Sequence, residues 1–191
     1  MLFDFHTHNL QAPAGAALIN LPLAWIDNPS LFVPRAGALY TAGIHPWWTV
    51  DEAALSRRLS HLEQLLAHPQ VVAVGECGLD RMRGADMAVQ EEVLTRQLRW
   101  AEQYRLPVTL HVVRAFDRLL YLRRKFSPTT QWTVHGFRGK PALARQLLQA
   151  GFHLSFGKHY HPESYALTPP DCRREETDEE EENTEAFAPN S

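Results

Sequence analysis

The chain alternates short apolar runs of strand length with longer segments in which apolar residues recur at helical spacing. Short apolar runs bounded by turn residues are typical of buried strands, and helical patterns between them favour βα units. This order of elements indicates a parallel sheet with helices packed against it. The runs predict strands at 2–7, 38–44, 71–76, 107–111, 131–135 and 152–156, with a weaker seventh strand at 172–177.

Helix signals stand between these strands. Thr49 and Glu52 have the spacing of a capping box, and leucines follow them at helical intervals. Residues 87–105 carry a second helical pattern. Pro141 and Gly151 stand where the N1 and C′ positions of another helix would be.

The number of strands favours a barrel. Residues 9–36 contain four prolines and are expected to form a long irregular connection that could cover a site. A complete (β/α)8 barrel usually needs about 250 residues, and this chain has 191. We therefore predict an α/β fold, a TIM-like (β/α) barrel that is incomplete or altered at its C-terminus, without the eighth strand and the last helices.

Charge is distributed unevenly along the chain. Residues 171–191 hold nine acids and two bases, which leaves 17 bases and 13 acids in residues 1–170, a balance of +4. A mildly basic body permits a polyanionic substrate without requiring one. We assign 1–170 to the barrel domain and 171–191 to the last partial strand and an acidic tail that is expected to be disordered.

The composition also speaks against several protein classes. The chain has no run of 18 apolar residues, and its N-terminus lacks a basic start followed by an apolar segment. Cys77 and Cys172 do not form a CxxC pair, so a disulfide framework is not expected. A cytoplasmic protein without a membrane segment is the expectation, and no protein partner is implied.

Ligand-type side chains fall at the ends of successive predicted strands. His6 and His8 are two residues apart at the end of the first strand, so both imidazoles point to the same face. In a parallel barrel the C-terminal strand ends converge on one mouth, where active sites lie. The candidates at these ends are His6, His8, His45, Glu76, His111, His135 and Asp178.

Metal binding would explain this convergence. Imidazole suits Zn²⁺ and related ions, and it joins harder ions when carboxylates complete the site. Glu76 is central enough in the strand order to bridge two ions. Two ions roughly 3.5–4 Å apart can clamp the attacking and leaving oxygens of a displacement at phosphorus and activate a water. His45, in a Gly-x-His-Pro turn, either contacts substrate or packs.

Other residues have weaker contexts. Three histidines in helix or loop segments are expected at the surface or in packing, and two more follow Gly157 in a loop. These are His61, His68 and His153, then His159 and His161. Phosphate contacts are conceivable for Arg114, Arg138 and Lys158. Base stacking is conceivable for Trp47, Trp48 and Phe137, although core or lid packing is the more typical role of such residues.

Seven short motifs extend over nearly the whole chain. They are Asp4-Phe5-His6-Thr7-His8, Gly43-Ile44-His45-Pro46, Val74-Gly75-Glu76-Cys77-Gly78-Leu79-Asp80, Leu106-Pro107-Val108 through His111 with Arg114-Ala115, His135-Gly136-Phe137, Leu154-Ser155-Phe156-Gly157, and Glu176-Thr177-Asp178. With these motifs in this order, the chain resembles the TatD-related metal-dependent DNases. The resemblance implies a (β/α) barrel, a divalent metal site and hydrolysis of phosphodiester bonds in DNA.

The resemblance also implies roles for individual residues. One ion would be held by His6, His8, Glu76 and Asp178, and the second by Glu76, His111 and His135. Asp178 would orient or deprotonate the attacking water, and His45 would lie near the scissile phosphate. The implied cofactors are two divalent ions, Mg²⁺ or Mn²⁺ ahead of Zn²⁺, and the implied partner is a DNA substrate.

Two departures from the family pattern keep other functions open. Val113 stands where longer members have an arginine, and Arg114 follows one position later. The polar seventh strand would hold Asp178 poorly, which costs metal affinity, and Glu176 or another tail carboxylate could replace it. The alternatives are a metal-dependent hydrolase of another small phosphoester or amide, and a degenerate, non-catalytic barrel.

Overall fold

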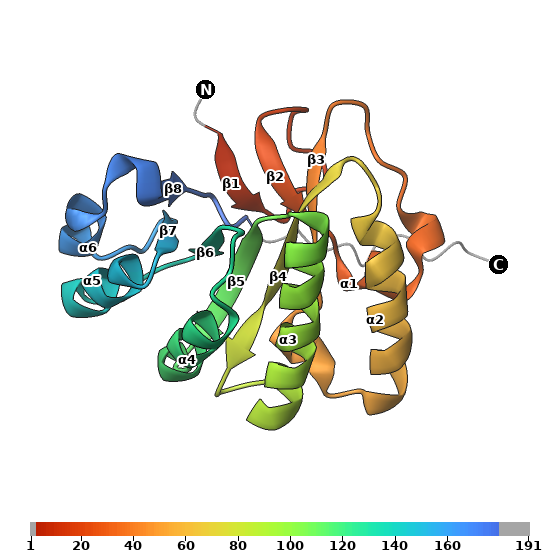
Figure 1. Ribbon diagram of the computed structural model, residues 1–191. Coiled ribbons are helices and arrows are strands. Elements are labelled where there is room, and N and C mark those ends of the chain that lie inside the picture. The colour runs from red at the N-terminus through yellow and green to blue at the C-terminus, as the bar shows by residue number, and fades with distance from the viewer. Residues whose placement is uncertain (1–2, 180–191) are drawn as a thin grey trace.

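Eight parallel strands form a nearly closed barrel in the computed structural model, which describes residues 3–179 (Figure 1). Each strand is hydrogen-bonded to the next, from β1 through β8, in sequence order. The predicted α/β class and barrel architecture are confirmed. The strands are β1 Asp4–Thr7, β2 Ala17–Asn20, β3 Leu39–Ala42, β4 Val71–Asp80, β5 Val108–Val113, β6 Trp132–Val134, β7 Phe152–Phe156 and β8 Arg173–Glu175.

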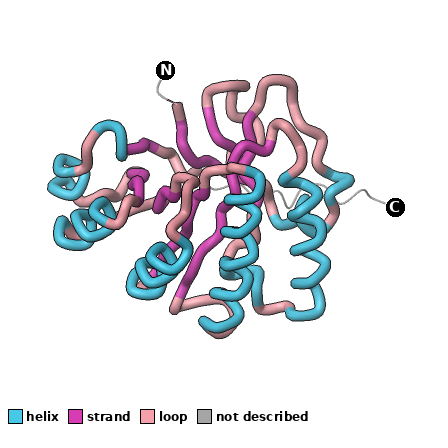
Figure 2. The backbone as a smooth tube through the Cα atoms, viewed as in Figure 1, coloured by secondary structure: helices cyan, strands magenta, loops and turns pink. Residues whose placement is uncertain are grey.

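Helices connect the strands and surround the sheet (Figure 2). The α-helices are α1 Leu23–Asp27, α2 Glu52–Leu66, α3 Met87–Tyr104, α4 Phe116–Phe126, α5 Pro141–Gln149 and α6 Pro162–Leu167. Short 3₁₀ helices are η1 Pro29–Leu31, η2 Pro46–Thr49 and η3 Pro170–Cys172. Among the described residues, no helix has the length and apolar character needed to cross a bilayer.

The expectation of an irregular connection over 9–36 was wrong. This segment contains β2, α1 and η1, and all four residues of β2 are buried between β1 and β3. The short apolar run of β2 was overlooked because it stands in a segment with four prolines, which are typical of loops and turns. The barrel therefore has eight strands: β2 brings the number to eight, and the strand predicted seventh, at 172–177, is β8. Within residues 3–179 no α-helix follows β8; residues 180–191 of the predicted acidic tail lie outside the described residues.

The first and last strands meet at a seam without a strand ladder. Two backbone hydrogen bonds cross this seam just beyond β8: the Asp178 N–H donates to the His6 carbonyl at 3.0 Å, and the His8 N–H donates to the Glu179 carbonyl at 3.1 Å. The Thr177 hydroxyl and N–H also donate to the Asp4 carboxylate, at 2.6 and 2.9 Å. These bonds attach the short polar end of the sheet to β1.

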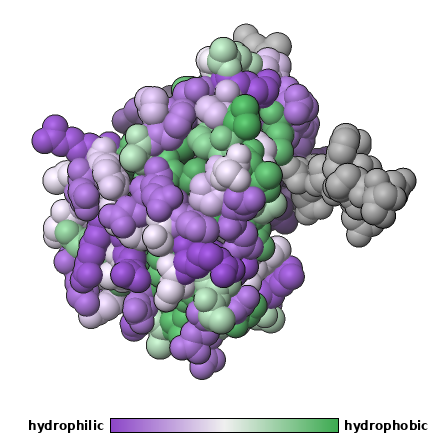
Figure 3. Space-filling view, turned by 90° about the vertical axis from the view of Figure 1, so that its right-hand side faces the viewer, coloured by the Kyte–Doolittle hydropathy of each residue, from purple (hydrophilic) through white to green (hydrophobic). Residues whose placement is uncertain are grey.

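One hydrophobic core fills the barrel and the layer between strands and helices. Leu62 of α2, Leu98 of α3 and Trp132 of β6 are fully buried. Burial of such side chains is the main source of stability for a barrel of this size. Polar residues cover most of the face drawn in Figure 3, with apolar residues gathered between them.

Helix ends follow local side-chain chemistry, with one correction to the sequence prediction. Asp51, not Thr49, caps α2, and its carboxylate accepts from the Ala54 N–H at 3.0 Å. The Thr49 hydroxyl instead donates to the Pro46 carbonyl. Pro141 and Gly151 occupy the predicted positions at the start of α5 and just beyond its end.

Glu102 near the end of α3 should stabilise the loop before β6, and its loss should be measurable. Its carboxylate accepts hydrogen bonds from the backbone N–H and hydroxyl groups of both Thr129 and Thr130. Burial raises the pKa of Glu102, but these donors outweigh it and lower the pKa from 4.5 to about 2. We expect Glu102→Gln to reduce the free energy of unfolding by about 1–2 kcal/mol at neutral pH, measured by urea denaturation.

The sign of the pH dependence follows from the lowered pKa of Glu102. The folded state favours the ionised carboxylate, so its contribution is present above the ordinary pKa and is lost as the pH falls toward about 2. The stability difference between the native chain and Glu102→Gln should therefore shrink between about pH 5 and about pH 3. A difference that does not change over this range would contradict the assignment.

Candidate metal centre

The barrel brings the predicted ligand residues together at one end of the sheet. His6 lies in β1 and His8 directly follows it, so the alternation of a strand points both rings inward. His111 lies in β5, and His135 directly follows β6. Glu76 differs from expectation because β4 continues to Asp80, which places the glutamate inside the strand and not at its end.

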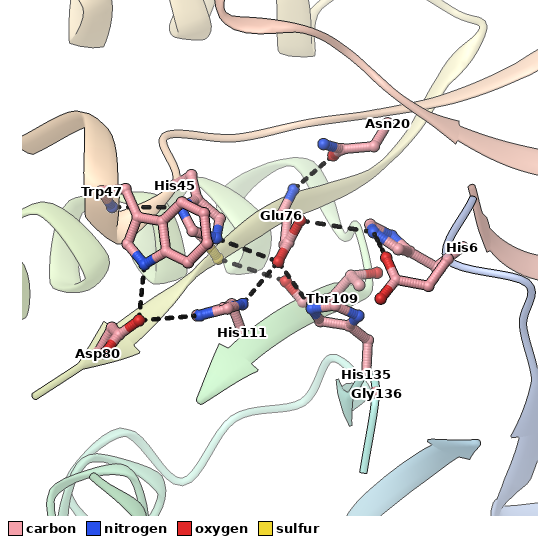
Figure 4. Close-up of polar contacts among 12 residues, drawn as sticks. His6, Asn20, His45, Trp47, Glu76, Asp80, Thr109, His111, His135 and Gly136 are labelled. Atoms are coloured by element: carbon pink, nitrogen blue, oxygen red, sulfur yellow. Dashed lines mark hydrogen bonds and ion pairs between the residues drawn. The ribbon is translucent and has the colours of Figure 1, made fainter. Parts of the chain in front are cut away.

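Glu76 occupies the centre of the site, and its two carboxylate oxygens face different histidines (Figure 4). Glu76 Oε2 lies 3.5 Å from His6 Nε2 and 3.6 Å from His8 Nε2. Glu76 Oε1 lies within 2.7–3.2 Å of one nitrogen each of His45, His111 and His135. The Glu76 backbone N–H donates to the Asn20 side-chain oxygen at 2.8 Å, so β2 supports the same residue.

The first group of donor atoms matches the size of a divalent metal shell. The Nε2 atoms of His6 and His8 are 3.3 Å apart, and they lie 3.7 and 3.8 Å from Asp178 Oδ1. Their distances to Glu76 Oε2 are similar. Donors about 2.1 Å from an ion in a tetrahedral arrangement are separated by about 3.4 Å. The residues present therefore fit a divalent cation.

The second group surrounds the other oxygen of Glu76. His111 Nδ1 and His135 Nε2 lie 2.8 and 2.7 Å from Glu76 Oε1, and His45 Nε2 lies 3.2 Å from it. A cation among these nitrogens would share Glu76 with the first group. Among the described residues, four overlapping groups at this centre have donor atoms close enough to share an ion: His6, Glu76 and His135; His6, His8 and Asp178; His45, Glu76 and His111; and His135, Glu176 and Asp178.

His45 differs from the other histidines in its hydrogen bonding. Its Nδ1 accepts from the Trp47 backbone N–H at 3.2 Å, at the start of η2. A neutral imidazole that accepts at Nδ1 carries its proton on Nε2. His45 Nε2 is therefore a donor toward the centre of the site, and it lacks the free lone pair that a metal ligand needs.

Burial and opposite charge shift the pKa values in the site. Burial raises the pKa of Glu76, but the facing imidazoles, His135 foremost, outweigh it and hold the pKa well below its ordinary value. Burial lowers the pKa of His8 and of His45. Burial also disfavours a charged His135, yet Glu76 and Glu176 raise its pKa well above the ordinary value. The ionised Glu76 is a suitable ligand for a divalent ion, whereas an ion that binds His135 would have to displace its proton.

Asp80 and Trp47 support His111 from behind, and the sequence prediction gave Asp80 no role. Asp80 Oδ2 lies 3.4 Å from His111 Nε2 and accepts from the Trp47 indole N–H at 2.6 Å. A carboxylate behind a ligating imidazole orients the ring and increases its basicity. The signal was present, since Glu76 and Asp80 have the even spacing that puts strand residues on one face.

Asp178 is held firmly despite the polar sequence around it. Its backbone bonds to His6, and Thr177 next to it is bound to Asp4. Glu176, which the sequence suggested as a substitute ligand, lies behind His135 with its Oε1 3.4 Å from His135 Nδ1. Glu176 Oε1 also accepts from the Gly136 N–H at 2.6 Å. Asp178 therefore lies beside His6 and His8, whereas Glu176 lies behind His135.

A pocket of about 390 Å³ opens beside these residues. Its wall away from the histidines is apolar and aromatic, formed by Pro22, Leu23, Trp47 and Trp48. Phe137 is 2% exposed and packs against Phe116 and Phe156, so it cannot stack on a ligand. His61, His68 and His153 contact other parts of the barrel wall and do not enter the centre.

Fold and site define the class of this protein: a parallel (β/α) barrel with a histidine- and carboxylate-rich candidate metal centre at the C-terminal ends of its strands. The model of the family described as TatD related DNase matches residues 34–179. The chain belongs to the TatD-related DNase family.

Individual relatives agree with this placement. The protein named 3'-5' ssDNA/RNA exonuclease TatD of Cronobacter turicensis is 39% identical over 135 residues, which cover 67% of this chain and 49% of that protein. The uncharacterized metal-dependent hydrolase YjjV of Escherichia coli is 36% identical over 76% of this chain and 58% of that protein. The superposition on the crystal structure of YjjV covers 93% of this chain and 78% of the YjjV chain, with a TM-score of 0.72 and 26% identity. The chain spans about half the length of the curated TatD proteins that it matches.

Proposed function

We propose that this chain is a metal-dependent hydrolase of the TatD type that cleaves phosphodiester bonds in DNA with a water activated by two metal ions. The main support is the geometry around Glu76, where five imidazoles face the two oxygens of one buried carboxylate. The relatives named as ssDNA/RNA exonucleases point to single-stranded nucleic acid as the substrate class.

The proposed ligands follow from the two groups of donor atoms. His6, His8, Glu76 and Asp178 would hold one ion, and Glu76, His111 and His135 would hold the other. Mg²⁺ or Mn²⁺ is the expected occupant, with Zn²⁺ as the alternative that histidine favours. When bound, two such ions lower the pKa of a water and offset charge on the scissile phosphate.

Three side chains would have further roles in the reaction. The Asp178 carboxylate, which lines the open pocket, would orient the attacking water and accept its proton. His45 Nε2–H would donate to a non-bridging oxygen of the phosphate, because its other nitrogen is engaged by the Trp47 N–H. Asp80 would keep His111 in its ligating orientation.

A second candidate is hydrolysis of another small phosphoester or an amide. The apolar wall of Pro22, Leu23 and the two tryptophans would accept many organic groups, and YjjV is named only as a metal-dependent hydrolase. A substrate panel separates the candidates. We expect Mn²⁺- or Mg²⁺-dependent cleavage of labelled single-stranded oligonucleotides above that of a phosphomonoester or an anilide. Faster turnover of the monoester or the anilide would favour the second candidate.

Replacement of His45 should affect turnover more than metal binding. We expect His45→Ala to lower kcat for DNA hydrolysis by about 10²-fold, because a donor to the developing charge on phosphate is lost. Its affinity for Mn²⁺, measured by calorimetry, should stay close to that of the native chain. His61→Ala on the outer helix α2 is the matched control and should change neither value. Loss of Mn²⁺ binding in His45→Ala would make His45 a ligand and contradict its assigned role.

A further inference from the structure

The metal centre opens on two sides that differ in chemistry. On one side lies the pocket lined by Trp47 and Trp48, whose lining has no basic residue other than histidine, although the Arg83 guanidinium stacks on Trp47 at 3.6 Å from the ring centroid. On the other side, Asp178 also lines two further hollows, of about 390 and 160 Å³. The larger lies at the ends of β5 and β6, and the smaller lies between the segments that follow β6 and β7. Both are lined by Gly136, Arg138 and Asp178, so the two hollows adjoin each other at the metal centre, and together they are called the groove.

Three cations border this groove. Arg114 lines the first hollow, Arg138 lines both, and Lys158 lines the second. All three side chains are exposed. The only hydrogen bond from any of them to a described residue is that of Arg114 to the sulfur of Met82 at 3.5 Å.

Arginines elsewhere on the barrel behave differently. Arg58, Arg81 and Arg118 are each paired with a carboxylate, at 2.7, 2.8 and 2.6 Å. By contrast, no carboxylate within residues 3–179 forms an ion pair with the three cations of the groove. Their charge is therefore available to an anionic ligand from solution.

The backbone at the start of the groove supports a role for Arg114. Arg114 adopts a φ of +52°, which a residue with a side chain rarely occupies, and Arg81 holds this turn by donating to the Arg114 carbonyl at 2.7 Å. Such outliers concentrate where a fold positions a side chain for function. Here Arg114 lines the larger hollow together with His111 and Asp178.

We propose that this groove binds the backbone phosphates of a single nucleic-acid strand whose terminal nucleoside lies in the pocket beside Trp47 and Trp48. This inference rests on the proposed function, since the scissile phosphate would lie at the metal centre between the two. A strand carries a negative charge at every nucleotide, which matches the three cations that line the groove beside Glu176 and Asp178. Its terminal base and sugar match the aromatic wall of the pocket, where the Arg83 guanidinium also stacks on Trp47. A small phosphomonoester would use the centre and leave the groove without a ligand.

The test compares a double variant with a matched control. Arg138→Ala with Lys158→Ala removes two cations of the groove and touches no proposed ligand. Arg124→Ala with Lys125→Ala removes two exposed cations from the end of α4, at the opposite end of the barrel. Binding of a labelled single-stranded oligonucleotide is measured in EDTA by fluorescence anisotropy over a range of salt concentrations. Hydrolysis of the same oligonucleotide and of bis(p-nitrophenyl) phosphate, a diester without a strand, is measured with Mn²⁺.

We expect the groove variant to bind the oligonucleotide at least about tenfold more weakly than the native chain. The negative slope of log affinity against log salt should become shallower by about 1.4, since each phosphate contact on a single strand contributes about 0.7. Its kcat/KM should fall for the oligonucleotide and stay within about twofold for bis(p-nitrophenyl) phosphate. The α4 variant should match the native chain in all assays.

The two proposals can fail separately. Equal oligonucleotide binding by the native chain and the groove variant would overturn the groove, whatever the catalytic result. An equal loss of activity on the oligonucleotide and on the small diester would also overturn it, because the two cations would then act at the centre. If the groove variant binds the oligonucleotide more weakly and the native chain hydrolyses neither the oligonucleotide nor bis(p-nitrophenyl) phosphate, the groove would be supported and the proposed nuclease activity refuted.

Discussion

Glu76→Gln is expected to abolish hydrolysis and most of the metal affinity while the barrel stays folded. Glutamine keeps the shape of the side chain, but it removes the negative charge that both proposed ions share. Because Glu76 faces both groups of histidines, one substitution damages both sites at once. We expect a loss in kcat/KM of about 10⁴-fold or more, since positioning and charge compensation fail together.

Metal binding gives a second measurement that does not depend on turnover. Calorimetric titration with Mn²⁺ should show far weaker binding by Glu76→Gln than by the native chain, with circular dichroism as the check on folding. Glu63→Gln on the exposed surface of α2 is the matched control and should bind Mn²⁺ normally. If Glu76→Gln bound Mn²⁺ as the native chain does, the carboxylate would not be a bridge between ions.

Gly78→Ala is expected to cause the largest loss of stability among single substitutions near the site. Gly78 lies in β4 opposite His111 of β5, with a φ of +152°. A Cβ added there would lie 1.9 Å from the His111 carbonyl oxygen and 2.8 Å from its carbon. The two strands would have to separate where they carry Glu76 and His111. We expect a loss of about 4 kcal/mol or more in the free energy of unfolding, measured by urea denaturation.

Another glycine provides the control for this prediction. Gly15 also has a positive φ, of +72°, but a Cβ there would have no atom within 4 Å. Gly15→Ala should therefore cost only about 1 kcal/mol, from backbone strain alone. An unfolded Gly78→Ala chain beside a folded Gly15→Ala chain would meet the same expectation. Equal losses in the two variants would show that close approach of the strands is not the reason for Gly78.

Much of the barrel was readable from the chain because its longer elements have clear periods. The strands predicted at 38–44, 71–76, 107–111, 131–135 and 152–156 all overlap observed strands, and the helix predicted at 87–105 coincides with α3. β2 was missed because its short apolar run stands in a segment with four prolines, which are typical of loops and turns. The capping residue of α2 was misplaced because Thr49 and Asp51 are both good caps, and only the turn of η2 selects between them.

In the candidate site, too, some residues were predicted from the sequence and others were missed. The spacing of His6 and His8, and the placement of histidines at strand ends, predicted which side chains would gather. Asp80 was overlooked because the predicted strand stopped at residue 76, although β4 runs to residue 80. Asn20 could not be found, since it lies on the strand that was missed.

The sequence by itself determined the alternation of strands and helices and the residue types that converge at the mouth, because side-chain periodicity and strand ends are local properties of the chain. Only the tertiary structure decided that Glu76 is the centre of the cluster and that Asp178 is held at the seam by His6. These features depend on contacts between residues far apart in the chain, such as Asp4 with Thr177, whose distances no local pattern encodes.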